Sequence, residues 1–283
     1  MKQIKNDRLL QTIQDKKVLI AAHRGTWGGN IIQNTIGAYE TSLLSGAHII
    51  EVDVVQSTDG DFFAFHTGQE PGLLRIEKNL KEMTTAEIEA CKFTNCTQEF
   101  VSEKINRLDD ILEHFKNRCL INIDRSWWFW EDTIKLLKRH NMPDQIILKS
   151  APEKELLQVL QNIGAELMYM PIIRREGQLE TAKNYAVNLI GTEIIFNTEE
   201  SPLVTNSFID NLHNEGLLAW ANAITLDDTT YLSAGHDDNT SILQNMDKGW
   251  GWIIDKGFDI IQTDWPLHLS QYIKNNYGKG EKI

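Results

Sequence analysis

Eight short runs rich in β-branched and aliphatic residues alternate with longer stretches of helical period along this 283-residue chain. This alternation is typical of repeated strand–helix units, in which helices cover a parallel sheet. The expected strands are 18–23, 48–55, 120–124, 145–149, 166–172, 189–196, 217–223 and 260–264. The expected helices are 35–45, 109–116, 130–140, 153–163, 178–187, 203–215 and 241–256.

Such units can close into a barrel or form an open sheet, and the position of the polar residues separates the two. Polar side chains fall at the C-terminal ends of different strands: His23, Glu51, Asp53, Asp124, Lys149, Asn222 and Asp264. The top of a barrel collects residues from many strand ends, whereas an open sheet binds its ligand at one switch point. We therefore predict an α/β fold, a (β/α)₈ TIM barrel, with residues 1–283 forming a single domain.

A long segment, 61–104, interrupts the strand–helix order after the second strand. It contains an expected strand at 62–66 and an expected helix at 85–91. We predict that this insertion is an excursion over the barrel mouth. Long loops of this kind form lids or substrate walls, or they are purely structural, and both interpretations remain open.

Two carboxylates of the second strand, Glu51 and Asp53, are two residues apart and therefore project from the same face. Buried carboxylates this close repel each other unless a cation lies between them. Oxygen ligands favour a divalent cation such as Mg²⁺ or Ca²⁺, with Asp124 as a third ligand. Neutralisation by Arg24 or another basic residue is the alternative.

Two histidines, His23 and His66, each end an apolar run. Beside a metal site, one imidazole can accept a proton from the attacking oxygen while the other protonates the leaving alkoxide. Arg24 would help to stabilise the charge on the phosphoryl oxygens. This combination predicts a phosphodiesterase.

Several motifs occur in a characteristic order and spacing. They are His23-Arg24-Gly25, Asn34-Thr35, Glu51-Val52-Asp53, Asp59-Gly60, His66, the segment 217–222 with Trp220, Gly257-Phe258-Asp259 and Thr263-Asp264-Trp265-Pro266. Together they cover nearly the whole chain and resemble the glycerophosphodiester phosphodiesterase family. The resemblance implies a (β/α)₈ barrel that hydrolyses glycerophosphodiesters to glycerol 3-phosphate and an alcohol with a divalent cation.

The resemblance also implies roles for individual residues. These are acid/base catalysis for His23 and His66, phosphate binding for Arg24, metal binding for Glu51, Asp53 and Asp124, and a position near the substrate for Trp220. The chain departs from the family pattern at Gln33, at Thr67 and at Ser126, where a lysine is expected. Arg125 should point away from the site if the strand alternation continues, so we predict that Lys149 supplies the missing charge at the substrate.

Two other functions remain open. A sphingomyelinase D-like lyase or phosphotransferase would use the same histidines and stop at a cyclic phosphate, and the departures from the pattern also fit a catalytically silent binding barrel. Aromatic residues after the strand ends suggest a wall for a choline-like cation: Trp27, Trp127 and Trp265.

The bulk properties restrict the partners. A net charge of −12 disfavours nucleic acids and anionic membranes, while a small anionic substrate can still bind where local cations reverse the potential. No run approaches the ~20 apolar residues of a membrane span, and the N-terminus has no apolar stretch of signal-peptide length. The three cysteines lack a ligand-type or disulfide-type pattern, so we expect a cytoplasmic protein.

Overall fold

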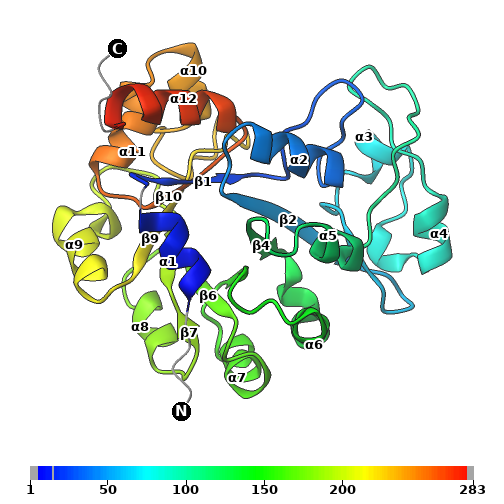
Figure 1. The fold of residues 1–283 in the computed structure, drawn as a ribbon, viewed down its shortest axis with the longest axis horizontal. Coiled ribbons are helices and arrows are strands. Elements are labelled where there is room, and N and C mark those ends of the chain that lie inside the picture. The colour runs from blue at the N-terminus through cyan, green and yellow to red at the C-terminus, as the bar shows by residue number, and fades with distance from the viewer. Residues whose placement is uncertain (1–5, 15, 279–283) are drawn as a thin grey trace.

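Eight parallel strands close into a barrel in the computed structural model of the chain, which describes residues 6–14 and 16–278 (Figure 1). Each barrel strand pairs with the next one along the chain, and β1 pairs with both β2 and β10, which closes the sheet. The barrel strands are β1 (Leu19–Ala22), β2 (Ile49–Gln56), β4 (Leu120–Asp124), β5 (Ile146–Ser150), β6 (Met168–Ile173), β8 (Gly191–Ile194), β9 (Leu218–Asn222) and β10 (Ile260–Thr263). The predicted (β/α)₈ barrel is confirmed. A two-residue strand, β7 (Asn188–Leu189), pairs with β6 just before β8, so the expected strand 189–196 is interrupted.

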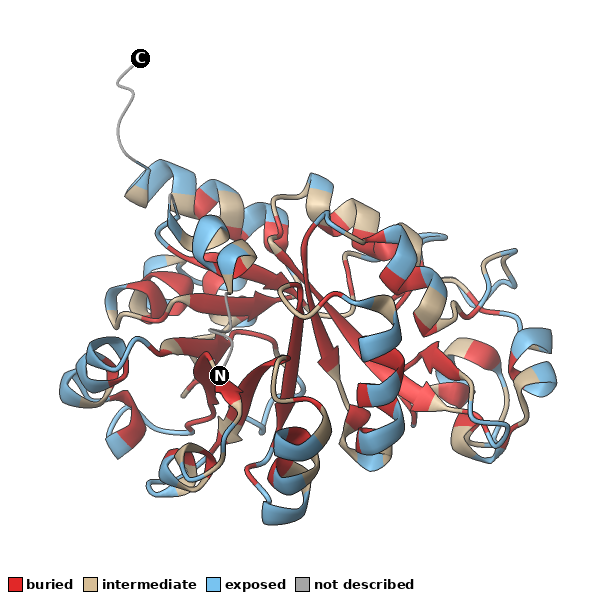
Figure 2. Cartoon of the chain, turned by 60° about the horizontal axis from the view of Figure 1, so that its bottom comes forward, coloured by how far each residue is buried: buried red, intermediate tan, exposed pale blue. Residues whose placement is uncertain are grey.

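Helices surround the barrel and bury one face each, as the colours of Figure 2 show. They are α1 (Asp7–Gln14), α2 (Ile36–Leu44), α5 (Leu108–His114), α6 (Trp130–His140), α7 (Lys154–Ile163), α8 (Gln178–Lys183), α9 (Asn206–Asn214), α10 (Asp238–Leu243), α11 (Trp252–Asp255) and α12 (Pro266–Tyr277). Short 3₁₀ turns occur at Leu80–Glu82, Ser126–Phe129 and Pro202–Val204. Within the described residues, no helix has the length and apolar character needed to cross a bilayer.

Three expected helices differ from the structure, and α1 and α12 were not predicted. The segment 241–256 is not one helix, because a π-helical turn, Asp247–Gly251, separates α10 from α11. A Cβ at Gly249 would lie 2.0 Å from Ser241 Oγ, so the backbone approaches α10 too closely for a larger residue. Helix α9 begins after a 3₁₀ turn, at the N-cap Thr205, and α8 ends at Lys183.

The barrel interior changes from apolar to polar along the strands. Near the N-terminal ends, one buried cluster includes Leu19, Ile49, Leu120, Met168 and Ile260, and Leu9 of α1 packs into it. Residues two and four positions further along a strand face the same way, so the polar residues after these aliphatic ones also point inward. The strands therefore direct the predicted site residues toward the C-terminal end of the barrel.

The insertion 61–104 lies beside the barrel next to β2, where it carries α3 and α4 on the right of Figure 1. Its strand β3 (Phe62–Ala64) pairs antiparallel with β2, and its helices are α3 (Glu70–Leu74) and α4 (Thr85–Ala90). The insertion has a core of its own, formed by Phe63, Phe65, Leu80, Ile88 and Phe93, among others. The expected strand is thus confirmed but ends at Ala64, and the expected helix ends one residue early.

Candidate metal and catalytic site

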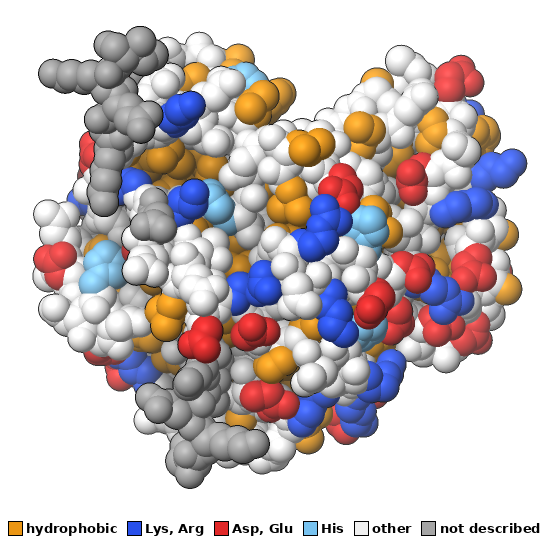
Figure 3. Space-filling view, viewed as in Figure 1, with side chains coloured by type: hydrophobic (Ala, Val, Ile, Leu, Met, Phe, Trp, Pro, Cys, Tyr) orange, Lys and Arg blue, Asp and Glu red, His pale blue; other side chains and the backbone are white. Residues whose placement is uncertain are grey.

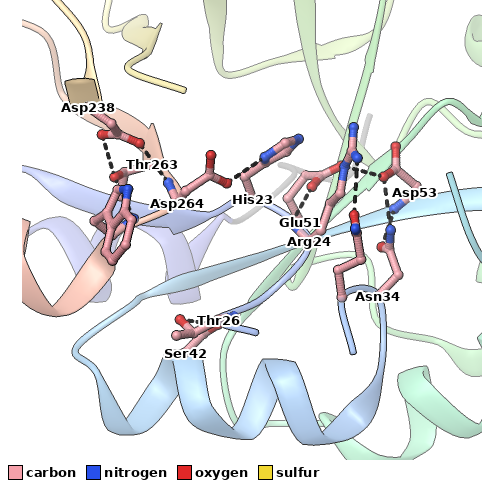
Figure 4. Close-up of polar contacts among 12 residues, drawn as sticks. His23, Arg24, Thr26, Asn34, Ser42, Glu51, Asp53, Asp238, Thr263 and Asp264 are labelled. Carbon is pink, nitrogen blue, oxygen red and sulfur yellow. Dashed lines mark hydrogen bonds and ion pairs between the residues drawn. The ribbon is translucent and has the colours of Figure 1, made fainter. Parts of the chain in front are cut away.

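The turn after β1 places Arg24 between two carboxylates. Arg24 and Gly25 both have positive φ angles, 55° and 79°, so the chain turns sharply after His23. The backbone N–H of Arg24 donates to Glu51 Oε2 at 2.8 Å, and its Nε lies 3.0 Å from Asp53 Oδ2 (Figure 4). Its Nη1 donates to Gln33 Oε1 at 3.1 Å, so the family departure at Gln33 leaves the arginine anchored.

Three carboxylates meet at the C-terminal ends of β2 and β4. Asp53 pairs in register with Asp124, and oxygen atoms of Glu51, Asp53 and Asp124 all lie within 4.8 Å of one another. Glu51 Oε1 and Asp124 Oδ1 are buried and have no hydrogen-bond partner. The structure therefore brings together the three residues that the sequence singled out as metal ligands.

The charges of this cluster are poorly balanced by the protein alone. Burial, together with Asp53 and Asp124, raises the pKa of Glu51 well above its usual value. Burial also raises the pKa of Asp124, although Lys149 opposes this shift. Burial acts in the same direction on Asp53, but Arg24 and the histidines lower the pKa of its carboxyl group. A cation between these oxygens would remove the repulsion and satisfy the two unpaired atoms.

The two histidines have different surroundings. Nδ1 of His23 lies 2.8 Å from Asp264 Oδ1. Asp264 thus contacts Nδ1 of the His23 ring and leaves Nε2 for another contact. His66 follows β3, and its Nδ1 is buried without a hydrogen-bond partner. Burial lowers the pKa of His66 to about 4, although Asp53 acts in the opposite direction. His66 is therefore neutral near pH 7.

Lys149 and Trp220 lie deeper in the barrel than expected of substrate contacts. Lys149 is 1% exposed, its Nζ is 2.6 Å from Glu193 Oε2, and it lies 4.2 Å from the ring centroid of Trp220. Trp220 is fully buried and donates from Nε1 to Asn222 Oδ1 at 3.1 Å. Their contact with a substrate stays a prediction, while the observed role of Lys149 is to balance Glu193 and to influence Asp124.

The prediction for Arg125 was wrong. Its φ is 55°, so the strand alternation ends at Asp124 and the side chain turns toward the site. Its Nε lies 4.0 Å from Asp53 Oδ1, and its Nη2 donates to Thr67 Oγ1 at 3.4 Å. Arg125 thus supplies a second cation at the carboxylate cluster.

Sequence reasoning also missed residues that hold the site in place. Asn34 donates to Asp53 Oδ2 at 3.0 Å, and its Oδ1 accepts from the backbone of Asp53 and from Tyr39. Asp238 accepts from the backbone N–H of Asp264 at 2.9 Å and thereby anchors the partner of His23 (Figure 4). The Asn34-Thr35 motif was a usable signal for Asn34, but no pattern in the sequence pointed to Asp238.

The chain is similar to curated glycerophosphodiester phosphodiesterases, which confirms the resemblance found in its motifs. A family model described as a domain of unknown function, DUF4996, matches residues 169–273. A curated glycerophosphodiester phosphodiesterase of Caldanaerobacter subterraneus subsp. tengcongensis is 29% identical over 145 residues, which cover 47% of this chain and 58% of that protein. The match thus spans less than two thirds of that relative's length.

Solved structures support the fold over nearly the whole chain. A glycerophosphoryl diester phosphodiesterase from Parabacteroides distasonis has a TM-score of 0.79 at 17% identity, with 96% of this chain and 93% of that one covered. An Oleispira antarctica phosphodiesterase, solved in complex with the product sn-glycerol-3-phosphate, has a TM-score of 0.66 at 17% identity, with 90% and 96% covered. At these identities the likeness establishes the barrel fold.

Proposed function

We propose that this chain hydrolyses glycerophosphodiesters to glycerol 3-phosphate and an alcohol with the help of a divalent cation. The observation that carries the proposal is the carboxylate cluster of Glu51, Asp53 and Asp124, in which two buried oxygens have no partner. Two histidines and two arginines adjoin it. The similarity to a curated glycerophosphodiester phosphodiesterase supports this choice of substrate.

The three carboxylates fit a hard divalent ion, Mg²⁺ or Ca²⁺, because they offer only oxygen ligands. When bound, such an ion would neutralise the cluster and withdraw electron density from a phosphoryl oxygen. Arg24 and Arg125 would hold the remaining phosphoryl oxygens by charge-assisted hydrogen bonds. We keep Lys149 and Trp220 as predicted contributors to substrate binding, acting from inside the barrel.

The histidines would divide the proton transfers. His66 is neutral near pH 7, so it can accept the proton of the attacking oxygen. Asp264 orients the ring of His23, whose Nε2 is then available to donate a proton to the leaving alkoxide. The P–O bond to the alcohol breaks as the new P–O bond forms. If the attacking oxygen belongs to water, glycerol 3-phosphate forms directly. If it belongs to the glycerol 2-hydroxyl, a cyclic phosphate forms first, and a water molecule then opens it to glycerol 3-phosphate.

We further propose that the protein is cytoplasmic and acts on a small-molecule substrate. Residues 1–283 would form one phosphodiesterase domain, in which 61–104 contribute to the barrel mouth. The three cysteines are free thiols, which supports a reducing compartment. On the face drawn in Figure 3, Lys and Arg side chains are interspersed with Asp and Glu. Together with the net charge of −12, this arrangement disfavours a polyanionic nucleic acid as substrate.

The test is an assay of glycerophosphodiesters against Mg²⁺, Ca²⁺, Mn²⁺ and Zn²⁺, with ³¹P NMR of the products. The proposal expects glycerol 3-phosphate, formed only with an added divalent ion and lost in Glu51→Gln. A cyclic phosphate that persists would indicate the sphingomyelinase D-like reaction instead. A complete lack of turnover with every ion would instead favour the alternative of a catalytically silent binding barrel.

A further inference from the structure

An exposed tryptophan beside the site is flanked by two cations of the protein itself. Trp128, in the turn after β4, is 48% exposed. Nζ of Lys81 lies 3.6 Å from the centroid of its ring, and Cζ of Arg125 lies 4.7 Å from the same centroid. Lys81 also lies 5.8 Å from the ring centroid of Phe129. Lys81 comes from the insertion and Arg125 from the barrel, so the ring joins the two parts.

This cluster adjoins the proposed catalytic centre. Arg125 reaches both Asp53, at 4.0 Å, and Thr67, at 3.4 Å, and Thr67 directly follows His66. A diester with its phosphorus near the carboxylate cluster would therefore extend one of its substituents past Arg125. The cations on Trp128 would be the groups that such a substituent meets.

Among the described residues, Lys81 has no ion-pair partner, and Arg125 shares its partner Asp53 with Arg24. Within the part of the chain that the structure describes, no carboxylate lies within 4.0 Å of Lys81 Nζ, and Asp53 is the carboxylate within this distance of Arg125. Asp53 itself is 3.0 Å from Arg24. Glu70 lies near enough to Lys81 to raise its pKa, but it forms no ion pair with Lys81 within 4.0 Å, and its two oxygens accept from the backbone N–H groups of Gly68 and Leu80.

Arg125 also disfavours the positive charge of Lys81. Partial burial lowers the pKa of Lys81, and Arg125 adds to this shift. Cation–π contact with Trp128 offsets part of the repulsion but supplies no counter-charge. An anion that bound between Lys81 and Arg125 would be attracted to both side chains and would reduce the repulsion between them.

We propose that Lys81 and Arg125, held on Trp128, form a cationic wall that selects diesters whose alcohol group carries a phosphate or carboxylate. The inference rests on the proposed function and specifies its substrate class. A quaternary ammonium group would be repelled, because the protein's own cations already lie against this ring. The choline-binding role considered for Trp27, Trp127 and Trp265 would then have to act against the charge of this wall.

The test compares three diesters of glycerol phosphate that differ in the charge of the alcohol: glycerophosphocholine, glycerophosphoglycerol and glycerophosphoglycerol phosphate. Binding is measured by isothermal titration calorimetry without an added divalent ion, and kcat/KM is measured with one. We expect affinity to rise from the cationic to the anionic alcohol by on the order of 10-fold or more, and this difference to shrink at high salt.

Substitutions of Lys81 test whether the preference for anionic diesters depends on the charge at this position. Lys81→Met keeps the aliphatic stem on the ring and should remove most of the preference, whereas Lys81→Arg should retain it. Lys78→Met is the matched control, because Lys78 lies in the same insertion and pairs outside the site with Glu87 at 2.8 Å. It should leave the preference unchanged.

Two outcomes distinguish this inference from the proposed function. Equal binding of the three diesters, or a preference that persists in Lys81→Met, would overturn the cationic wall whether or not the protein is active. Selective binding of the anionic diester without turnover by any divalent ion would support the wall and overturn the proposed hydrolysis.

Discussion

The buried carboxyl group of Asp238 should make the stability of the protein depend on pH. Asp238 is 2% exposed and accepts hydrogen bonds from Trp250 Nε1 at 2.8 Å, Thr263 Oγ1 at 2.7 Å and the backbone N–H of Asp264 at 2.9 Å. These three donors favour the carboxylate. Burial, together with the nearby Asp264, outweighs them and raises the pKa of Asp238 from 3.8 to about 8.

The direction of the effect follows from the raised pKa. The folded state binds the proton of Asp238 more tightly than the unfolded state, so the stabilisation is complete below the unfolded pKa and is lost as pH rises through the folded one. Each pH unit between these values corresponds to about 1.4 kcal/mol. Across the whole interval the loss is at most about 6 kcal/mol, since relaxation around the buried charge would reduce it.

Urea unfolding of the wild type and of Asp238→Asn between pH 5 and 9 would measure this effect. Burial lowers the pKa of His48 and of His66 to about 4, which produces an opposite trend below pH 7 that is common to both proteins. We therefore expect the difference between their unfolding free energies to fall by about 1 kcal/mol per unit from pH 5 to 7 and to level off above about 8. Asp228→Asn, at an exposed position, is the control.

If the difference in unfolding free energy between the wild type and Asp238→Asn does not change with pH, the reasoning is refuted. That result would mean that the three hydrogen bonds outweigh burial, so that Asp238 stays ionised throughout this range. The variant has a further cost at every pH, because an asparagine cannot accept from all three donors at once. A buried donor left without an acceptor costs about 1–3 kcal/mol.

Four other substitutions test the site and the barrel. Glu51→Gln should raise the stability of the metal-free protein by about 1 kcal/mol by relieving repulsion, and should abolish the rise in Tm on adding Mg²⁺ or Ca²⁺; differential scanning calorimetry measures both. Alanine at His23 or at His66 should each lower kcat on the order of 100-fold, and a diester with a p-nitrophenolate leaving group should rescue only the His23 variant, which would lack the proton donor. Gly191→Ala should destabilise the barrel by about 2 kcal/mol or more in urea unfolding, since its Cβ would lie 2.3 Å from the carbonyl oxygen of Leu218.

The barrel strands could be predicted because each contains a short apolar run, and most have a polar residue at or just after the C-terminal end. The two-residue period then placed Glu51 and Asp53 on one inward face, and the register of β2 with β4 brought Asp124 beside them. Helices were less predictable. The close approach of Gly249 to Ser241, which divides the expected helix 241–256, depends on tertiary packing that the local sequence does not show.

Contacts that hold the site in place were harder to predict for a related reason. Asp238 lies on α10, far in sequence from His23, and reaches it only through Asp264. Asn34 has a positive φ of 58°, a conformation that asparagine adopts more readily than most residues, and this turn brings its amide group to Asp53. Both contacts depend on how separate segments meet at the barrel end.

Arg24 and Arg125 both reach the site through a left-handed backbone turn, and this turn explains why the predicted direction of the Arg125 side chain was wrong. Each follows the last inward residue of its segment, His23 or Asp124, and strand alternation would turn both arginines outward. Each instead has a φ of 55°, and the left-handed turn brings the guanidinium back to the barrel axis. Arg24 then lies 3.0 Å from one oxygen of Asp53, and Arg125 lies 4.0 Å from the other. Arginine has no special preference for positive φ, so the turn cannot be predicted from the residue type. Tertiary contacts must stabilise it, and a carboxylate between two arginines provides such a contact for both.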